Sequence, residues 1–245
     1  MTDEPLAEKR VGIRSRLRAW GGALAITLLG CVLAGLGCFV LLSNYLWQQI
    51  ESQRLDLFHA AVWWQLGFTA AMVIILGVII VWQRARGSSL TELGWGRPTT
   101  TLALFLAVLL GLAYLGSSYF GAQFLLRGVD VTEFNWVRVA LAPVGIFLAI
   151  GEETMMRGFF MTELRRARVA TWLQIVASGA CSAVYHAFQN PTLIGFLPSF
   201  ILFSMHAGLY VLGRRSLTPV VITHSIYHVF GEPYLLMMAL MAMRH

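Results

Sequence analysis

The chain has 245 residues, of which 58% are hydrophobic and 12% are charged, and its mean hydropathy is +0.69. Soluble domains carry about 25% charged residues, so this composition excludes an ordinary soluble domain and indicates an integral membrane protein. The net charge of +6 does not point to nucleic acid, because the basic residues cluster beside the apolar segments, as in proteins whose loop charges set their membrane orientation.

Three long uncharged stretches come first in the chain. They cover residues 20–42, 60–83 and 98–126, and each reaches the roughly 20 apolar residues that a membrane-spanning helix needs. A fourth span is predicted to begin near Trp136. Residues 169–213 contain no Asp, Glu, Lys or Arg and are too long for one span. Asn190-Pro191 and Pro198 favour turns there, so two helices are predicted.

The C-terminal part predicts two more helices. One runs from Ser216 to about Phe230, and the apolar residues 233–243 predict a short final helix. The predicted fold class is therefore all-α, a multi-pass membrane helical bundle with seven or eight transmembrane helices. Residues 1–19 form a basic N-terminal segment, and residues 20–245 form the membrane domain.

The distribution of basic residues predicts the orientation of the bundle. Loops on one side carry only Arg54, Arg127 and Arg138, with several acidic residues among them. Because Lys and Arg are enriched in cytoplasmic loops, the N-terminus is predicted to be cytoplasmic, and the expected location is the bacterial cytoplasmic membrane. The basic residues on the predicted cytoplasmic side are Lys9, Arg10, Arg14, Arg16, Arg18, Arg84, Arg86, Arg97, Arg165, Arg166, Arg168, Arg214 and Arg215.

A charged motif ends the fourth apolar run. The sequence Glu152-Glu153-Thr154-Met155-Met156-Arg157 holds two carboxylates and a guanidinium, and charges inside a membrane are costly and usually functional. On a helix, Glu153 and Arg157 are four residues apart and can form an ion pair, which would also suit a purely structural clamp. Glu152 lies about 100° further around the helix, so the two acids are predicted to have separate roles.

Histidines of later helices lie at a similar depth. At about 1.5 Å per residue, the acidic pair lies roughly 18 to 20 Å from the cytoplasmic helix end, His186 roughly 22 Å and His228 roughly 20 Å. His224 lies four residues before His228, so both rings occupy one helix face and can address a single cavity. His206 is explained at least as well by an ordinary interhelical hydrogen bond.

A carboxylate and imidazoles in a desolvated site suit general acid/base catalysis. A glutamate can activate water for hydrolysis of a peptide bond, and His186 can hold the same water or help to transfer its proton. His224 and His228 can donate hydrogen bonds to a developing oxyanion. This chemistry needs no covalent intermediate, and no cofactor is predicted.

Three motifs in order resemble the CPBP family, the CAAX-protease and bacteriocin-processing group of glutamate-dependent intramembrane proteases that includes the Rce1-type prenyl endopeptidases. Glu152 to Arg157 is similar to the family's EExxxR motif. His186 matches the histidine of FxxxH, and His224 matches that of HxxxN/D. The resemblance covers roughly residues 89–230, the predicted protease core.

The resemblance implies that Glu152 and His186 position and activate water, and that His224 and His228 stabilise the oxyanion. Two residues depart from the family pattern: Ser182 replaces phenylalanine, and His228 replaces Asn or Asp. The implied substrate is a membrane-associated protein or peptide, which includes prenylated CAAX proteins, bacteriocin-like peptides and C-terminal sorting tails.

Two alternatives compete with this interpretation. Glu152, His186 and His224 are ligand types suited to zinc with an open fourth position, although the chain has no HExxH motif. A non-enzymatic protein is the other alternative: buried Glu and His residues also line the proton paths of transporters or hold helices together in an immunity or scaffold protein. No inverted repeat of the kind found in many transporters is evident.

Overall fold

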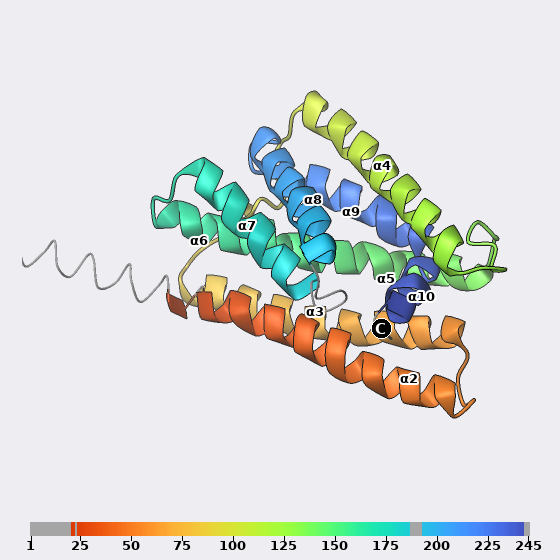
Figure 1. Ribbon diagram of the computed structural model, residues 1–245. Coiled ribbons are helices and arrows are strands. Elements are labelled where there is room, and N and C mark those ends of the chain that lie inside the picture. The colour runs from red at the N-terminus through yellow and green to blue at the C-terminus, as the bar shows by residue number, and fades with distance from the viewer. Residues whose placement is uncertain (1–20, 23, 187–192, 243–245) are drawn as a thin grey trace, which may run out of the picture.

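The computed structural model describes residues 21–22, 24–186 and 193–242, and these residues form helices joined by turns, with no strand among them (Figure 1). The predicted all-α fold class is confirmed. The predicted basic segment 1–19 and the turn at Asn190-Pro191 lie outside the described residues.

Eight helical rods make up the described part of the chain. The first covers Leu24–Glu51 and contains the π-helix η1 (Leu33–Leu42) followed by α2 (Ser43–Glu51). A later rod, which lies at the centre of the bundle, covers Trp136–Arg166 and joins three consecutive helical elements without a break. In chain order the remaining elements are α3 (Leu57–Ala85), η2 (Leu90–Leu93), α4 (Thr101–Leu125), α5 (Trp136–Glu153), η3 (Thr154–Phe160), α6 (Met161–Arg166), α7 (Thr171–His186), α8 (Leu193–Leu212), α9 (Thr218–Gly231) and α10 (Tyr234–Ala242).

Side-chain caps fix the start of three long helices. Asp56 accepts a hydrogen bond from the backbone N–H of His59 before α3, and Thr100 and Asn135 cap α4 and α5 in the same way. Such caps satisfy backbone donors that have no partner within the helix. The predicted start of the fourth span near Trp136 is confirmed.

Within the described residues, four helices are long and apolar enough to cross a membrane: Leu24–Glu51, Leu57–Ala85, Thr101–Leu125 and Trp136–Arg166. A shorter apolar helix covers Phe196–Leu212. Large apolar side chains are exposed on the outside of the bundle, among them Phe105, Phe120 and Phe124 on α4. An outer surface of this kind is suited to lipid and not to water.

The turn predicted at Pro198 is wrong. Pro198 lies inside α8, near the start of that helix. Proline is tolerated in membrane helices, because neighbouring groups can satisfy the backbone carbonyl that it leaves without a partner.

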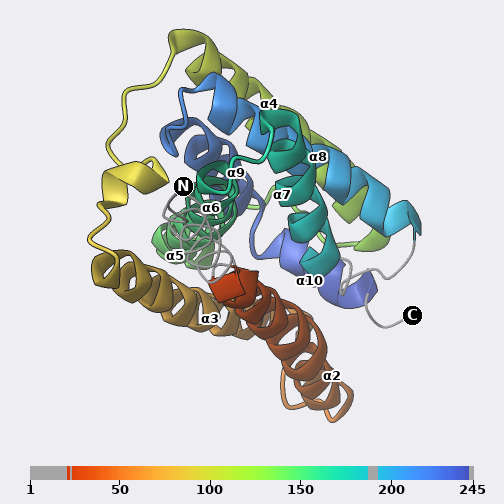
Figure 2. The ribbon, with the colours of Figure 1, turned by 90° about the vertical axis from the view of Figure 1, so that its left-hand side faces the viewer.

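The rod formed by α5, η3 and α6 occupies the centre of the bundle. Figure 2 looks along this rod and shows α2 and α3 on one side, with α4, α8 and α9 on the other. α5 packs against α3 and α9, and α9 packs against α4. Every residue from 151 to 164 is buried, so the acidic motif lies in the interior of the protein.

An ion-pair network anchors one end of the central rod. Arg86 contacts Glu163 at 2.8 Å, and Arg166 pairs both with Glu163 and, at 2.5 Å, with Glu92. Hydrogen bonding from Arg166 lowers the pKa of the Glu92 carboxyl below its usual range. Thr162 also donates a hydrogen bond to the backbone carbonyl of Glu92 at 3.2 Å. These contacts tie η2 and the end of α3 to α6.

Candidate active site

The predicted Glu153–Arg157 ion pair is present at the centre of the bundle. Glu153 Oε2 lies 3.2 Å from Arg157 Nε, and both side chains are 0% exposed. Arg157 Nη2 donates a hydrogen bond to the carbonyl of Phe203 at 2.9 Å, and the guanidinium lies over the Phe203 ring. Helix geometry changes from α to π at Thr154, directly after Glu153, and π turns are frequent at functional sites.

Glu153 also binds two histidines from other helices. Its Oε1 lies 3.0 Å from Nδ1 of His206 on α8 and 3.0 Å from Nδ1 of His224 on α9. A carboxylate only accepts hydrogen bonds, so both nitrogens donate to it. His206 thus makes the interhelical hydrogen bond that the sequence suggested, and Glu153 joins α5, α8 and α9.

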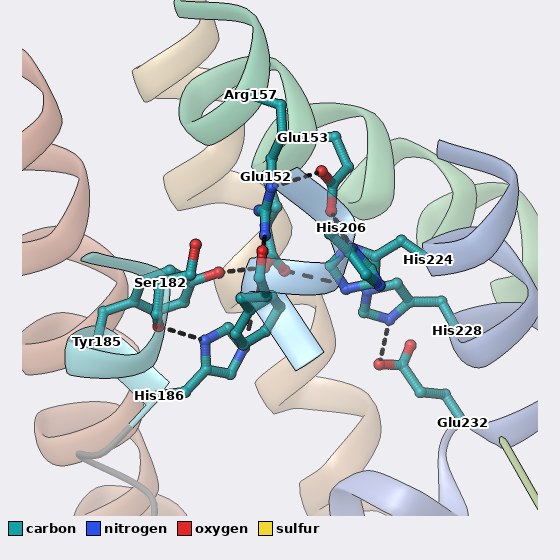
Figure 3. Close-up of polar contacts among 11 residues, drawn as sticks. Glu152, Glu153, Arg157, Ser182, Tyr185, His186, His206, His224, His228 and Glu232 are labelled. Carbon is teal, nitrogen blue, oxygen red and sulfur yellow. Dashed lines mark hydrogen bonds and ion pairs between the residues drawn. The ribbon is translucent and has the colours of Figure 1, made fainter. Parts of the chain in front are cut away.

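Glu152 points in a different direction from Glu153, as predicted. It is 1% exposed, and its Oε2 accepts a hydrogen bond from the hydroxyl of Tyr185 on α7. His186 Nε2 lies 3.9 Å from the same oxygen, and His228 Nε2 lies 4.0 Å from Oε1. Figure 3 shows the carboxylate between these histidines, which come from α7 and α9.

His186 is the last residue of α7, and its orientation is set by its own helix. Nδ1 lies 2.9 Å from the carbonyl of Ser182, which can only accept, so this nitrogen is the donor. The other ring nitrogen is then directed toward Glu152. The imidazole also packs against the rings of Tyr185 and Phe203, with centroid distances of 4.1 and 4.4 Å.

His224 and His228 lie on one face of α9, as predicted. Their rings stack with centroids 4.7 Å apart. Nδ1 of His228 lies 2.6 Å from Oε1 of Glu232, the residue that follows α9. The other oxygen of Glu232 accepts a hydrogen bond from Gln65 Nε2 on α3.

These side chains divide into two groups around a cavity of about 250 Å³. Glu153, Arg157 and His206 do not line the cavity and lie behind it. Apolar side chains from α3, α4 and α10 complete the wall, including Trp64, Phe68 and Leu235. The titratable side chains that line it are Glu152, His186, His224, His228, Glu232, Tyr114 and Tyr227.

Three residues of the site do not stand out in the sequence. Tyr185 directly precedes His186 and carried no separate signal. Glu232 follows His228 by four residues, the same spacing that places His224 and His228 on one face, but the helix was predicted to end near Phe230. Gln65 is a single polar residue inside a long apolar run.

The structure groups the possible metal-binding atoms differently from the sequence hypothesis. Glu152, His224 and His228 offer atoms within 4.8 Å of one another, and so do Glu153, His206 and His224. His186 is in neither group. The second group contains the carboxylate that already pairs with Arg157, which is unfavourable for a cation.

The fold and the site define a helical membrane protein with a buried glutamate–histidine centre. Residues 134–230 match the sequence model of the family described as type II CAAX prenyl endopeptidase Rce1-like. The resemblance drawn from three motifs is therefore confirmed over this part of the chain. No curated protein and no solved structure matches the chain.

Proposed function

We propose that the protein is an intramembrane endopeptidase in which Glu152 activates water to hydrolyse a peptide bond of a membrane-associated protein. The observation that carries this proposal is the position of Glu152. Its carboxylate is buried and lines the cavity. A histidine nitrogen lies on each side of it, His186 Nε2 at 3.9 Å and His228 Nε2 at 4.0 Å.

Glu152 and His186 act on the water in this mechanism. The carboxylate accepts a proton from a water molecule that His186 helps to hold, and the resulting hydroxide adds to the carbonyl carbon of the peptide bond. Tyr185 fixes the carboxylate through its hydroxyl, so the base does not have to reorient during the reaction. Preorganisation of this kind is a main source of catalytic power.

His224 stabilises the oxyanion that forms on the carbonyl oxygen. Its ring lines the cavity, while Nδ1 donates to Glu153. With a proton on the second nitrogen as well, the imidazolium donates to the oxyanion, whose negative charge offsets its positive charge. Arg157 and His206 hold Glu153 in place and act through it.

The walls of the cavity suit an apolar substrate segment. Trp64, Phe68, Leu235, Leu236 and Met238 present aromatic and aliphatic surface beside the acid and the histidines. The matched family is described as a CAAX prenyl endopeptidase. We therefore propose as substrate a C-terminal CAAX-type segment whose cysteine carries a prenyl group.

The direct test uses purified protein in lipid nanodiscs and a fluorogenic CAAX-type peptide, prepared with and without a farnesyl group. Wild-type protein is expected to cleave the farnesylated peptide. Glu152→Gln removes the base without changing the size of the side chain, so kcat should fall by about 100- to 10,000-fold. Glu51→Gln, at an exposed position at the end of α2, is the matched control and should keep full activity.

The outcomes separate this proposal from its alternatives. Turnover by a folded Glu152→Gln variant would contradict the glutamate mechanism. Equal cleavage of both peptides would show that the prenyl group is not recognised, while the protein would still be a protease. Loss of activity with a chelator, together with zinc in the purified protein, would favour a metal-dependent hydrolase.

A further inference from the structure

His228 stands where the resembling family has Asn or Asp, and it does not stand alone. Glu232, two residues beyond the matched domain, lies one helical turn after it, with Oε1 2.6 Å from His228 Nδ1. Both residues are buried, at 2% exposure for Glu232 and 7% for His228. The chain therefore carries a carboxylate–imidazole pair at this edge of the cavity (Figure 3).

Glu232 is itself fixed in position. Its second carboxylate oxygen accepts a hydrogen bond from Gln65 Nε2, which reaches across from α3 and is 1% exposed. Glu232 thus has one oxygen for Gln65 and one for the imidazole. A buried carboxylate needs such partners, because an unpaired charge in the interior is strongly unfavourable. The arrangement links α3, which carries Gln65, to α9, which carries His228, through Glu232 in the short connection between α9 and α10.

The contact with Glu232 determines which ring nitrogen of His228 carries a proton and which carries a lone pair. Since an ionised carboxylate only accepts, the proton of the neutral imidazole is on Nδ1, and Nε2 bears the lone pair. Nε2 is buried and has no hydrogen-bond partner among the described residues. It lies 4.0 Å from Glu152 Oε1, and the ring lines the cavity.

We infer that Glu232 is a positioning residue that holds His228 as the tautomer with a bare Nε2, and that His228 carries a proton from Glu152 to the nitrogen of the cleaved bond. This inference rests on the proposed peptide hydrolysis. It gives His228 a role that Asn cannot perform, because an amide side chain does not accept and release a proton in this way.

The proton balance of the reaction closes with these groups. Glu152 takes one proton from water as the hydroxide bonds to the carbonyl carbon. Glu152 then passes that proton to His228 Nε2, and the Glu232 carboxylate balances the charge of the imidazolium. When the carbon–nitrogen bond breaks, the imidazolium gives the proton to the leaving nitrogen. The products are a carboxylic acid and an amine, and all three side chains return to their starting states.

The tautomer can be measured without any substrate. Nitrogen-15 NMR of histidine-labelled protein distinguishes a protonated from a bare ring nitrogen, and the signals of His228 are assigned by their loss in His228→Asn. We expect a protonated Nδ1 and a bare Nε2 in the wild type, and a loss of this preference in Glu232→Gln. A proton on Nε2 in the wild type, or an unchanged tautomer in Glu232→Gln, would overturn the positioning role.

A double-mutant cycle tests the catalytic use of the pair. Glu232→Gln should lower kcat by about 10- to 100-fold, as is typical when the partner that orients a functional histidine is lost, with little change in KM. In a His228→Asn background the same change should have no further effect, because the two residues act as a unit. Independent, multiplicative losses in kcat would overturn the inference.

A matched control and the wild-type assay complete the test. Glu133→Gln, an exposed glutamate in the loop before α5, should leave kcat unchanged. If the wild-type protein cleaves the peptide but the double-mutant cycle shows no coupling between Glu232 and His228, only the proposed proton transfer by His228 is refuted. If the wild type cleaves no peptide, the proposed function and the carrier role fail together, while the NMR result separately decides the positioning role of Glu232.

Discussion

At the residue scale, the ion pair behind the cavity has a different task from the groups that line it. Glu153 and Arg157 are fully buried, and removal of one partner from a buried pair leaves an uncompensated charge. Arg157→Met should therefore lower the free energy of unfolding by about 3 to 5 kcal/mol. Denaturant unfolding of the protein in detergent micelles, followed by tryptophan fluorescence, measures this change.

A double variant distinguishes lost charge balance from lost packing. Glu153→Gln combined with Arg157→Met removes both charges, so it should recover a large part of the stability lost in Arg157→Met. Arg54→Met, at an exposed position after α2, is the control and should stay within about 0.5 kcal/mol of the wild type. A stable Arg157→Met protein would show that the pair does not hold α5 to its neighbours.

Helical spacing and membrane depth were enough to predict part of the site. The Glu153–Arg157 pair follows from a four-residue separation, and the different direction of Glu152 follows from its place on the helix. The partners of these residues were not predictable in the same way. Gln65 and Glu232 are 167 positions apart in the sequence, and no local sequence pattern indicates such a contact.

At the element scale, the close approach of α5 and α9 places His228 in the cavity wall. A Cβ added at Gly145 on α5 would lie 2.7 Å from His228 Cβ and 3.3 Å from its backbone carbon. Small residues allow helices to pack closely in membrane proteins. The position of His228 relative to Glu152 therefore depends on a glycine in a neighbouring helix.

Gly145→Ala should push α9 away from α5 and impair the site. Overpacking of this kind typically costs about 1 to 3 kcal/mol of stability, and kcat should fall because His228 moves relative to Glu152. Gly77→Ala on α3 is the matched control, since a Cβ at Gly77 would have no neighbour within 4 Å. Unfolding and peptide cleavage measured on both variants check the expectation, and an unaffected Gly145→Ala protein would contradict it.

Apolar runs predicted the helices well, because lipid requires each spanning segment to satisfy its own backbone hydrogen bonds. Details within the helices were less predictable. Pro198 did not end a helix, and residues 154–160 form a π-helix. Both depend on neighbouring helices, which the local sequence does not show.

At the scale of the whole molecule, the basic loops predict a cytoplasmic N-terminus. The loop between α2 and α3 should then face the opposite side of the membrane from η2. Cysteines introduced at the exposed positions Ser52 and Thr91 test this in intact cells with a membrane-impermeant thiol reagent. We expect labelling of Ser52→Cys from outside and labelling of Thr91→Cys only after lysis, and the reverse pattern would contradict the predicted orientation.

If Glu152 drives hydrolysis of a membrane-associated protein in the cell, the termini of membrane proteins will depend on it. Membrane proteins are analysed from cells that express either the wild type or Glu152→Gln at equal levels. We expect new C-termini in the wild-type cells, on proteins with a CAAX-type C-terminal segment, that are missing with Glu152→Gln. Identical sets of termini, with both proteins correctly folded in the membrane, would contradict it.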